Sequence, residues 1–248
     1  MAKAEHHYGI HAITALLESQ PEQVLGLFLL SGRQDAALNR LQQLASQHGI
    51  AVQWVGRDTL DRLTDRGRHQ GVVASVRPIP VQDERDLMQL LDQRPQALLL
   101  ALDEVSDPHN LGACLRSAAA MGADAVVVPR DRSSGLTPTV RKVAAGAVEQ
   151  IPLIQVGNLA RCLLQVQELG VQVIGTLLDD QARPLSQCDL TGPVMLVMGA
   201  EGHGLRRLTR ERCDQLAYIP MSGALQSLNV SVAAGMCLYE ACRQRGRA

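Results

Sequence analysis

The residue types best suited to chemistry lie in two loops of small residues toward the C-terminus. The apolar run 196–198 ends at Gly199, and the loop after it sets Glu201 among glycines, which is typical of the end of a buried strand. A second apolar segment, 216–220, ends in another loop of small residues, and residues 227–231 then open a long amphipathic helix. Small residues let a ligand approach backbone N–H and C=O groups closely, so these loops predict a ligand-binding site.

A third segment, upstream of these loops, carries polar groups of the same kind. Asp107–Pro108 is followed by Asn110, and Arg116 lies in the helix expected after it. Taken alone, this segment is a turn whose Asn110 caps the helix, and a lone arginine there is a solvated or salt-bridged surface group. Glu201 has an equally plain interpretation as a loop carboxylate, and Asn229 as the N-cap of the last helix. The chemical interpretation therefore depends on the three segments acting as one set.

The elements that position these groups form two α/β units. Residues 1–76 predict a compact unit with helices over 10–17 and 36–48 and strands over 24–30, 51–55 and 72–76. The segment 77–94 begins with a Pro-rich break and continues polar and acidic, which predicts a linker that allows a short helix. From 95 to 248, apolar strands alternate with helices, which predicts a mostly parallel sheet covered on both faces, with strands over 97–102, 125–128, 151–155, 171–176, 195–198 and 216–219.

Composition disfavours several classes of function. Aromatic residues make up only 2% of the chain, which argues against RNA modules that stack bases on aromatic side chains. The net charge of −1 gives no overall signal for a polyanion, so nucleic-acid binding requires local basic patches, such as Arg62, Arg66 and Arg68 in the first unit. The segment 103–108 after the first strand of the second unit lacks G-x-G-x-x-G, which disfavours a Rossmann dinucleotide site.

The cysteines and the N-terminal residues indicate the cellular compartment of the protein. The six cysteines are scattered without any C-x-x-C pair, which disfavours a metal site and suits a reducing cytosol. The N-terminal residues contain no apolar core of a leader peptide, and no apolar run approaches the length of a membrane span. We therefore expect a soluble, cytoplasmic protein without a membrane partner.

The three segments together resemble motifs 1, 2 and 3 of the SPOUT methyltransferases, in the TrmH-like group that methylates ribose 2′-hydroxyls. Motif 1 corresponds to residues 102–112 with Arg116, and motifs 2 and 3 lie within 196–240, in the family order. The resemblance implies S-adenosyl-L-methionine as cofactor and a trefoil knot in the C-terminal domain. General rules of topology alone predict an unknotted doubly wound fold.

The resemblance also assigns site residues. It implies catalytic roles for Arg116, with Asn110, Glu201, Asn229 and Ser231 around it, and it implies that the backbone at Gly199, Ile219 and Leu228 holds the adenosine part of the cofactor. Arginine stays protonated at physiological pH, so we expect Arg116 to stabilise developing oxyanion charge or to grip the adjacent phosphate. The family works as a homodimer, and the resemblance implies that the C-terminal helix through Leu238 is part of the interface.

The first unit points to the class of RNA. It resembles the small L30e-like substrate-binding domain of the ribosomal RNA members, which transfer-RNA members generally lack, and it carries Arg68-His69-Gln70-Gly71 at a strand start, as those members do. The resemblance implies 2′-O-methylation of a guanosine in 23S rRNA, in naked rRNA or in a ribosomal precursor. Two alternatives stay open: an enzyme acting on tRNA or on another rRNA nucleoside, and a non-catalytic RNA-binding protein of the same fold.

Overall fold

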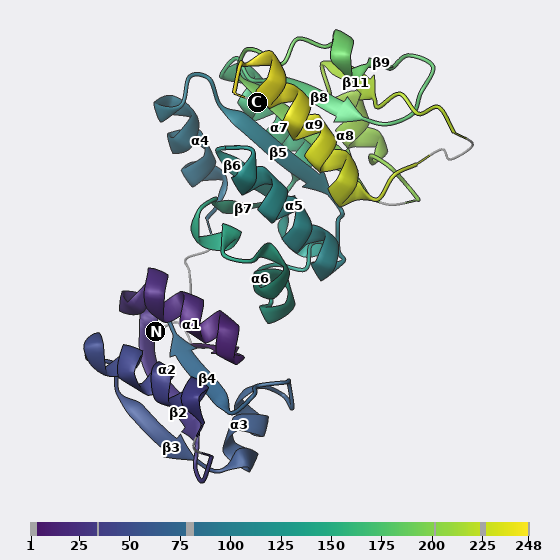
Figure 1. The fold of residues 1–248 in the computed structure, drawn as a ribbon. Coiled ribbons are helices and arrows are strands. Elements are labelled where there is room, and N and C mark those ends of the chain that lie inside the picture. The colour runs from purple at the N-terminus through teal and green to yellow at the C-terminus, as the bar shows by residue number, and fades with distance from the viewer. Residues whose placement is uncertain (1–3, 34, 78–81, 201, 224–226, 248) are drawn as a thin grey trace. The chain divides into compact units, whose positions relative to one another are not determined.

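The computed structural model describes residues 4–33, 35–77, 82–200, 202–223 and 227–247 (Figure 1). The chain forms two compact units, Met1–Pro80 and Val81–Ala248. Both mix helices with a sheet, as the sequence predicts. Across these described ranges, none of the helices combines the length and the apolar character that crossing a membrane requires.

The first unit is built on a four-stranded sheet. Its strand order is β1-β4-β2-β3, and only the β2–β3 pair is parallel. Leu27 and Leu29 of β2 are fully or almost fully buried against Leu17 and Leu38 of the helices. The elements are β1 (Glu5–Tyr8), α1 (Ile10–Ser19), η1 (Pro21–Gln23), β2 (Val24–Leu30), α2 (Ala36–Gln47), β3 (Val52–Val55), α3 (Arg57–Leu63) and β4 (Val72–Val76).

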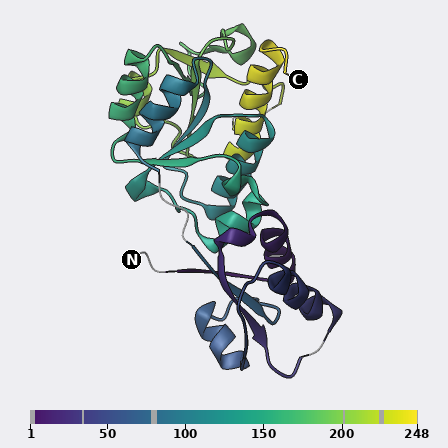
Figure 2. The ribbon, with the colours of Figure 1, turned by 90° about the vertical axis from the view of Figure 1, so that its left-hand side faces the viewer.

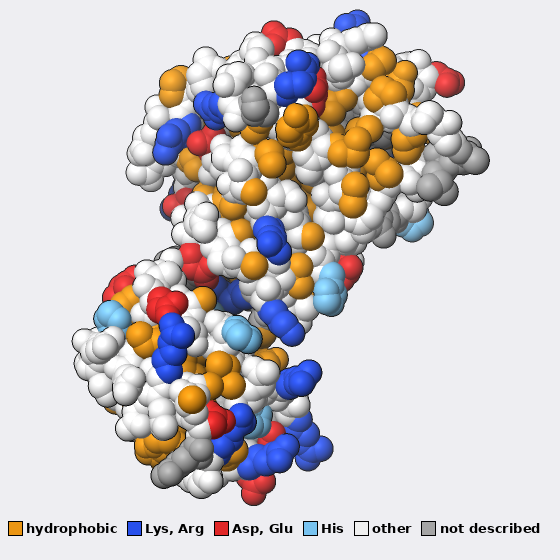
Figure 3. Space-filling model, viewed as in Figure 1, with side chains coloured by type: hydrophobic (Ala, Val, Ile, Leu, Met, Phe, Trp, Pro, Cys, Tyr) orange, Lys and Arg blue, Asp and Glu red, His pale blue; other side chains and the backbone are white. Residues whose placement is uncertain are grey.

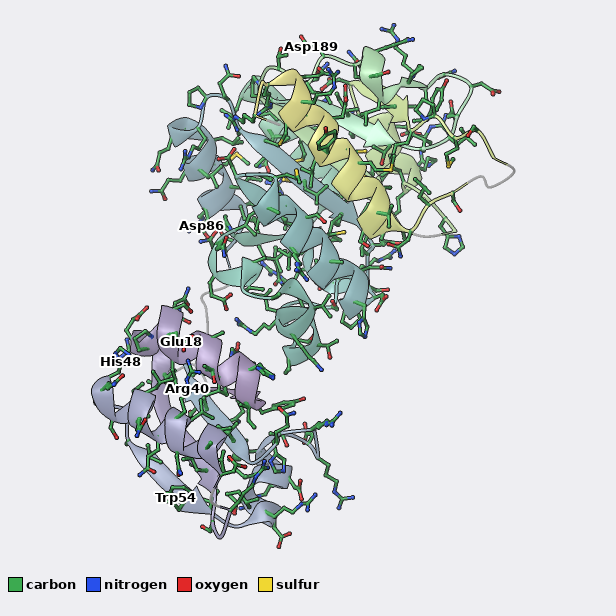
Figure 4. The ribbon with its side chains drawn as sticks, in the orientation of Figure 1. Glu18, Arg40, His48, Trp54, Asp86 and Asp189 are labelled. Carbon is green, nitrogen blue, oxygen red and sulfur yellow. The ribbon has the colours of Figure 1, made fainter. Side chains whose placement is uncertain are left out.

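Helix α2 begins and ends at residues suited to those positions. The Asp35 carboxylate accepts a hydrogen bond from the Leu38 amide at 2.9 Å and caps α2, and Gly49 takes a left-handed φ of +68° just beyond the end of that helix. Arg40 of α2 pairs with Glu18 of α1 at 2.7 Å, on the outer surface of the unit (Figure 4). The predicted helices and strands of this unit are confirmed, whereas the short β1 and α3 have no apolar pattern that sequence reading detects.

The second unit is built on a seven-stranded sheet in which every pairing is parallel. Its strand order is β7-β6-β5-β10-β8-β11-β9. The strands are β5 (Leu98–Asp103), β6 (Ala125–Pro129), β7 (Leu153–Val156), β8 (Gln172–Thr176), β9 (Arg183–Pro184), β10 (Val194–Gly199) and β11 (Gln215–Tyr218). The helices are α4 (Glu84–Gln93), α5 (Pro108–Ala120), η2 (Arg130–Arg132), α6 (Pro138–Ala144), η3 (Ala147–Glu149), α7 (Leu159–Glu168), η4 (Leu185–Gln187), α8 (Arg207–Glu211) and α9 (Val230–Gln244).

The parallel sheet is covered on both faces, which confirms the prediction from its continuous apolar strands. Every residue of β5 is buried. Helices α4 and α7 share one core with Leu99, Ala101 and Val197. Helices α5 and α9 lie side by side over the other face, as both ribbon views show (Figures 1 and 2). The two-residue β9 has too short a pattern to be predicted.

Helix α4 belongs to the second unit. The Asp83 carboxylate accepts from the Arg85 amide and Asp86 accepts from the Asp83 amide, both at 2.8 Å, so α4 begins with a capping box. Leu87 and Leu91 on its inner face lie in the hydrophobic core of this unit. The short helix allowed within the predicted linker 77–94 thus exists, and it is part of the packed second unit rather than a connection between units.

Candidate active site

The candidate site lies at the carboxyl ends of the parallel strands. β5 ends at Asp103, which pairs in register with Gly199 at the end of β10. The strand β8 separates β10 from β11, so the ends of all four strands meet at one edge of the sheet. This edge is where open parallel sheets bind their ligands.

Asn110 and Asn229 meet at this edge although they are far apart in the sequence. The Asn229 Nδ2 donates to Asn110 Oδ1 at 2.8 Å. The Asn229 Oδ1 accepts from the Ser231 amide at 3.0 Å and from the Ser231 hydroxyl at 2.6 Å, and so caps α9. Since that oxygen must face the backbone amides, the NH₂ group of Asn229 is the part turned toward Asn110. Three of the predicted catalytic residues thus form one hydrogen-bonded group.

Of the two capping roles predicted from the sequence, one is confirmed and one is wrong. Asn229 is the N-cap of α9, as predicted. Asn110 does not cap α5, because Asp107 takes that role by accepting from the His109 amide at 3.0 Å. With the helix start satisfied by Asp107, the Asn110 amide is left to join α5 to α9.

Arg116 is an exposed side chain on α5. Within the described parts of the chain, no carboxylate pairs with its guanidinium. The alternative of a salt-bridged surface arginine therefore finds no support among these residues. An exposed guanidinium carries five N–H donors and is suited to bind a phosphate or a developing oxyanion.

The loop after β10 is glycine-rich for its own packing. A Cβ on Gly199 would lie 2.1 Å from the Gly204 carbonyl carbon and 2.4 Å from the Leu205 nitrogen, so no other residue fits there without moving the backbone. The Gly204 amide donates to the Ala200 carbonyl at 2.9 Å and closes the loop on itself. Sequence reasoning ascribed Gly199 to ligand approach, and the structure adds this internal reason. Glu201 lies outside the described residues.

The remaining predicted cofactor residues flank this loop. Ile219 follows β11, and Leu228 directly precedes the Asn229 cap; both side chains are half-buried. In the sheet order, β8 alone lies between the strands that end near Gly199 and Ile219, which sets those strands roughly 10 Å apart at the usual strand spacing. A ligand held by both residues would therefore cross the end of β8.

The cysteines and the potential metal ligands are the remaining chemical groups of the described residues. All six cysteines are free, and burial raises the pKa of the Cys114, Cys162 and Cys237 thiols to about 12, which keeps them neutral. Within the described ranges, no group of His, Cys, Asp and Glu has the arrangement of a metal site.

The predicted RNA-binding arginines of the first unit lie together. Arg62 is at the end of α3, and Arg66 and Arg68 follow in the next loop; all three side chains are exposed. Figure 3 shows Lys and Arg side chains gathered over α3 and this loop. The loop is tightly held, because His69 Nδ1 accepts from the Gly71 amide and His69 Nε2 contacts Asp61, each at 3.0 Å. Sequence reasoning missed this bracing role of His69, since a lone histidine carries no signal for a long-range partner.

Comparisons with known proteins match both units. Residues 97–239 match the SpoU rRNA Methylase family, and residues 8–82 match the RNA 2′-O ribose methyltransferase substrate binding family. The chain is 60% identical over 246 residues to a 23S rRNA (guanosine-2′-O-)-methyltransferase RlmB of Acinetobacter baylyi, covering 99% of both chains. It is 50% identical over 242 residues to the protein of the same name from Escherichia coli, covering 98% of this chain and 99% of that one.

Solved structures give the same assignment. The SpoU methyltransferase AviRb from Streptomyces viridochromogenes in complex with AdoMet aligns with a TM-score of 0.77 and 25% identity, covering 99% of this chain and 92% of that one. An AdoMet-bound rRNA methyltransferase from Sinorhizobium meliloti aligns with a TM-score of 0.71 and 27% identity, covering 97% and 87%. The chain belongs to the SpoU rRNA methylase family and carries that family's RNA substrate-binding domain ahead of its methylase domain.

Proposed function

We propose that this protein transfers a methyl group from S-adenosyl-L-methionine to the ribose 2′-hydroxyl of a guanosine in 23S rRNA. The observation that carries the proposal is the 60% identity, across both units, to a relative that bears this activity in its name. The hydrogen-bonded group of Asn110, Asn229 and Ser231 supports it, because an intact site is what a decayed, non-catalytic relative would lose.

The chain's own residues supply alignment and electrostatics. When bound, the cofactor supplies a methyl group on a positively charged sulfur, which is reactive without further activation. The backbone at Gly199, Ile219 and Leu228 would hold its adenosine part at the ends of β10 and β11 and beside the start of α9. The fit rests on the strand spacing at this edge of the sheet, which accommodates a nucleoside.

Arg116 is proposed to act on the RNA side of the site. As the 2′-hydroxyl gives up its proton to solvent, its oxygen would carry developing negative charge, which the Arg116 guanidinium would stabilise. The Asn110–Asn229 pair, rigid because its amides bond each other and the start of α9, would orient the ribose. Glu201 is proposed to orient Arg116 or the asparagines.

The class of RNA is tested by offering both alternatives. The purified protein is incubated with isotope-labelled S-adenosyl-L-methionine and either total rRNA or total tRNA that lacks the modification. We expect label in the rRNA alone. Label in tRNA would support the tRNA alternative, and no label in either RNA would support a non-catalytic binding protein.

The first unit is proposed to bind the RNA through its exposed arginines. Replacing Arg62, Arg66 and Arg68 together by alanine should weaken RNA binding and flatten its dependence on salt by roughly one unit of slope for each phosphate that is no longer bound. Filter binding across a salt series measures this slope. Arg40→Ala is the matched control, because that arginine is exposed but already paired with Glu18. A triple variant with an unchanged slope would remove these arginines from the RNA interface.

We further propose a homodimer formed through α9. Val232, Met236 and Tyr239 recur at helical spacing on this helix with exposures of 52%, 44% and 53%, and Figure 3 shows hydrophobic side chains gathered over it. They flank a groove of about 450 Å³ that also contains Leu185 and Ile219. An exposed apolar stripe beside a groove is typical of an interface between subunits.

Light scattering tests this interface. The intact protein should have the mass of a dimer at micromolar concentration, and Met236→Glu should give a monomer because it places a charge in the apolar contact. Leu169→Glu, at another exposed apolar position on the end of α7, should leave the dimer intact. A monomeric wild-type protein would contradict the proposal.

A further inference from the structure

A cluster of ionised side chains joins the loops that surround the candidate site. We infer that Asp103, Glu104 and Arg206 are positioning residues that hold the two ends of the loop after β10, at Gly199 and at Arg206, where the loop receives the cofactor. The inference deepens the proposed function, since it rests on that loop being part of the cofactor site. None of these residues is expected to touch the reacting atoms.

Asp103 holds both ends of the loop. Its backbone pairs with Gly199, where the loop begins. Its fully buried carboxylate accepts from the Arg206 amide at 2.9 Å, directly after the loop ends, and from Arg206 Nε at 2.7 Å. Arg206 Nη2 lies 2.7 Å from the same carboxylate oxygen. A buried carboxylate with three charge-assisted or backbone donors is a rigid anchor.

Glu104 extends the anchor to two further loops. Its backbone adopts a left-handed φ of 62°, which is unfavourable for a residue with a Cβ. In this conformation its carboxylate lies 3.4 Å from Arg206 Nη1 and forms an ion pair with Arg132, which follows β6. Glu104 also opens the segment that leads to Asn110 on α5. The cluster therefore ties together the loops after β5, β6 and β10.

The loop needs such an anchor because of its composition. Gly202 and Gly204 have left-handed φ values of 84° and 64°, and glycine has the largest backbone freedom to lose on ordering. Without the anchor, binding a ligand would have to order the loop first, and affinity would fall by that entropy. With Arg206 and Asp103 in place, the two ends of the loop are held before the cofactor arrives.

The test compares neutral variants of the full-length protein in calorimetric titrations with S-adenosyl-L-methionine. The double variant Asp103→Asn, Arg206→Met removes both charges of the pair. It leaves no unpaired buried charge, so it should destabilise the fold less than either single substitution. We expect the affinity of this double variant to fall about tenfold and that of Glu104→Gln about threefold. Hydrogen exchange at residues 202–205 should become faster in both. Arg207→Met is the control. Arg207 is the next residue in the chain, but its guanidinium pairs with Glu211 at 2.7 Å on the exposed surface.

Kinetics separate positioning from a loss of fold. The KM for the cofactor should rise with its dissociation constant, while kcat at saturating cofactor stays within about threefold of the wild type. If the double variant does not fold, the affinity of Glu104→Gln tests the inference alone. The Glu104 side chain is partly exposed, so this substitution should leave the fold intact. Wild-type affinity in either folded variant overturns the inference. A wild-type protein that fails to bind the cofactor overturns the proposed function instead, and the inference with it.

Discussion

Replacing Arg116 by alanine should lower the rate of methylation by about a hundredfold or more while leaving cofactor affinity near the wild-type value. A loss of rate of this size is expected when one aligned group that stabilises charge in the transition state is removed. The side chain lies exposed on α5 and, among the described residues, is committed to no carboxylate, so its loss should cost little stability. Single-turnover methylation and calorimetry of the cofactor measure the two effects separately.

A matched arginine controls for the loss of a surface charge. Arg161 is also exposed on a helix of the second unit, but α7 covers the opposite face of the sheet from α5. Arg161→Ala should therefore methylate rRNA at the wild-type rate. Wild-type turnover in Arg116→Ala would remove Arg116 from the mechanism, and equal losses in both variants would indicate a general effect of charge.

Removing residues 1–80 should reduce methylation of 23S rRNA by at least about tenfold while cofactor binding and dimerisation persist. The second unit has its own core, and Asn110, Asn229 and Ser231 all lie within it. The first unit carries the exposed Arg62, Arg66 and Arg68, which we propose contribute affinity by contacting RNA phosphates. Methylation assays with full-length 23S rRNA, calorimetry of the cofactor and light scattering measure the three properties.

The point of truncation matters and provides an internal control. A fragment that begins at residue 95 would lose α4, and with it Leu87 and Leu91 from the core. Each buried leucine contributes about 2–5 kcal/mol, so this fragment should be much less stable in urea than the fragment 81–248. If the fragment 81–248 methylated rRNA at the same site without loss, the first unit would have another role and the tRNA alternative would gain support.

The parallel sheet was predictable because buried strands have a local signature. The continuous apolar runs at β5 and β10, separated by helical patterns, determine both the strand type and its burial. The cap at Asn229 was predictable for the same reason, since a cap interacts with its own helix. Such features depend on neighbours in the sequence.

The features that sequence reading missed depend on distant partners. Asn110 fits the pattern of a cap, yet it bonds Asn229 across two helices because Asp107 already satisfies the start of α5. The bond between Asp103 and Arg206 joins residues that no periodicity relates. The trefoil knot implied by the family resemblance remains a prediction. Sequence patterns could not have predicted it, because threading of the chain has no local pattern and general topological rules argue against knots.

Nucleoside mass spectrometry shows whether the protein transfers a methyl group to one guanosine ribose. Unmodified 23S rRNA made by transcription is incubated with the protein and labelled S-adenosyl-L-methionine, digested, and compared with the same reaction using Arg116→Ala. We predict one labelled 2′-O-methylguanosine per 23S rRNA with the wild-type protein and about a hundredfold less with the variant. Label on a base or on another nucleoside, or no label in 23S rRNA offered both naked and in a ribosomal precursor, would contradict it.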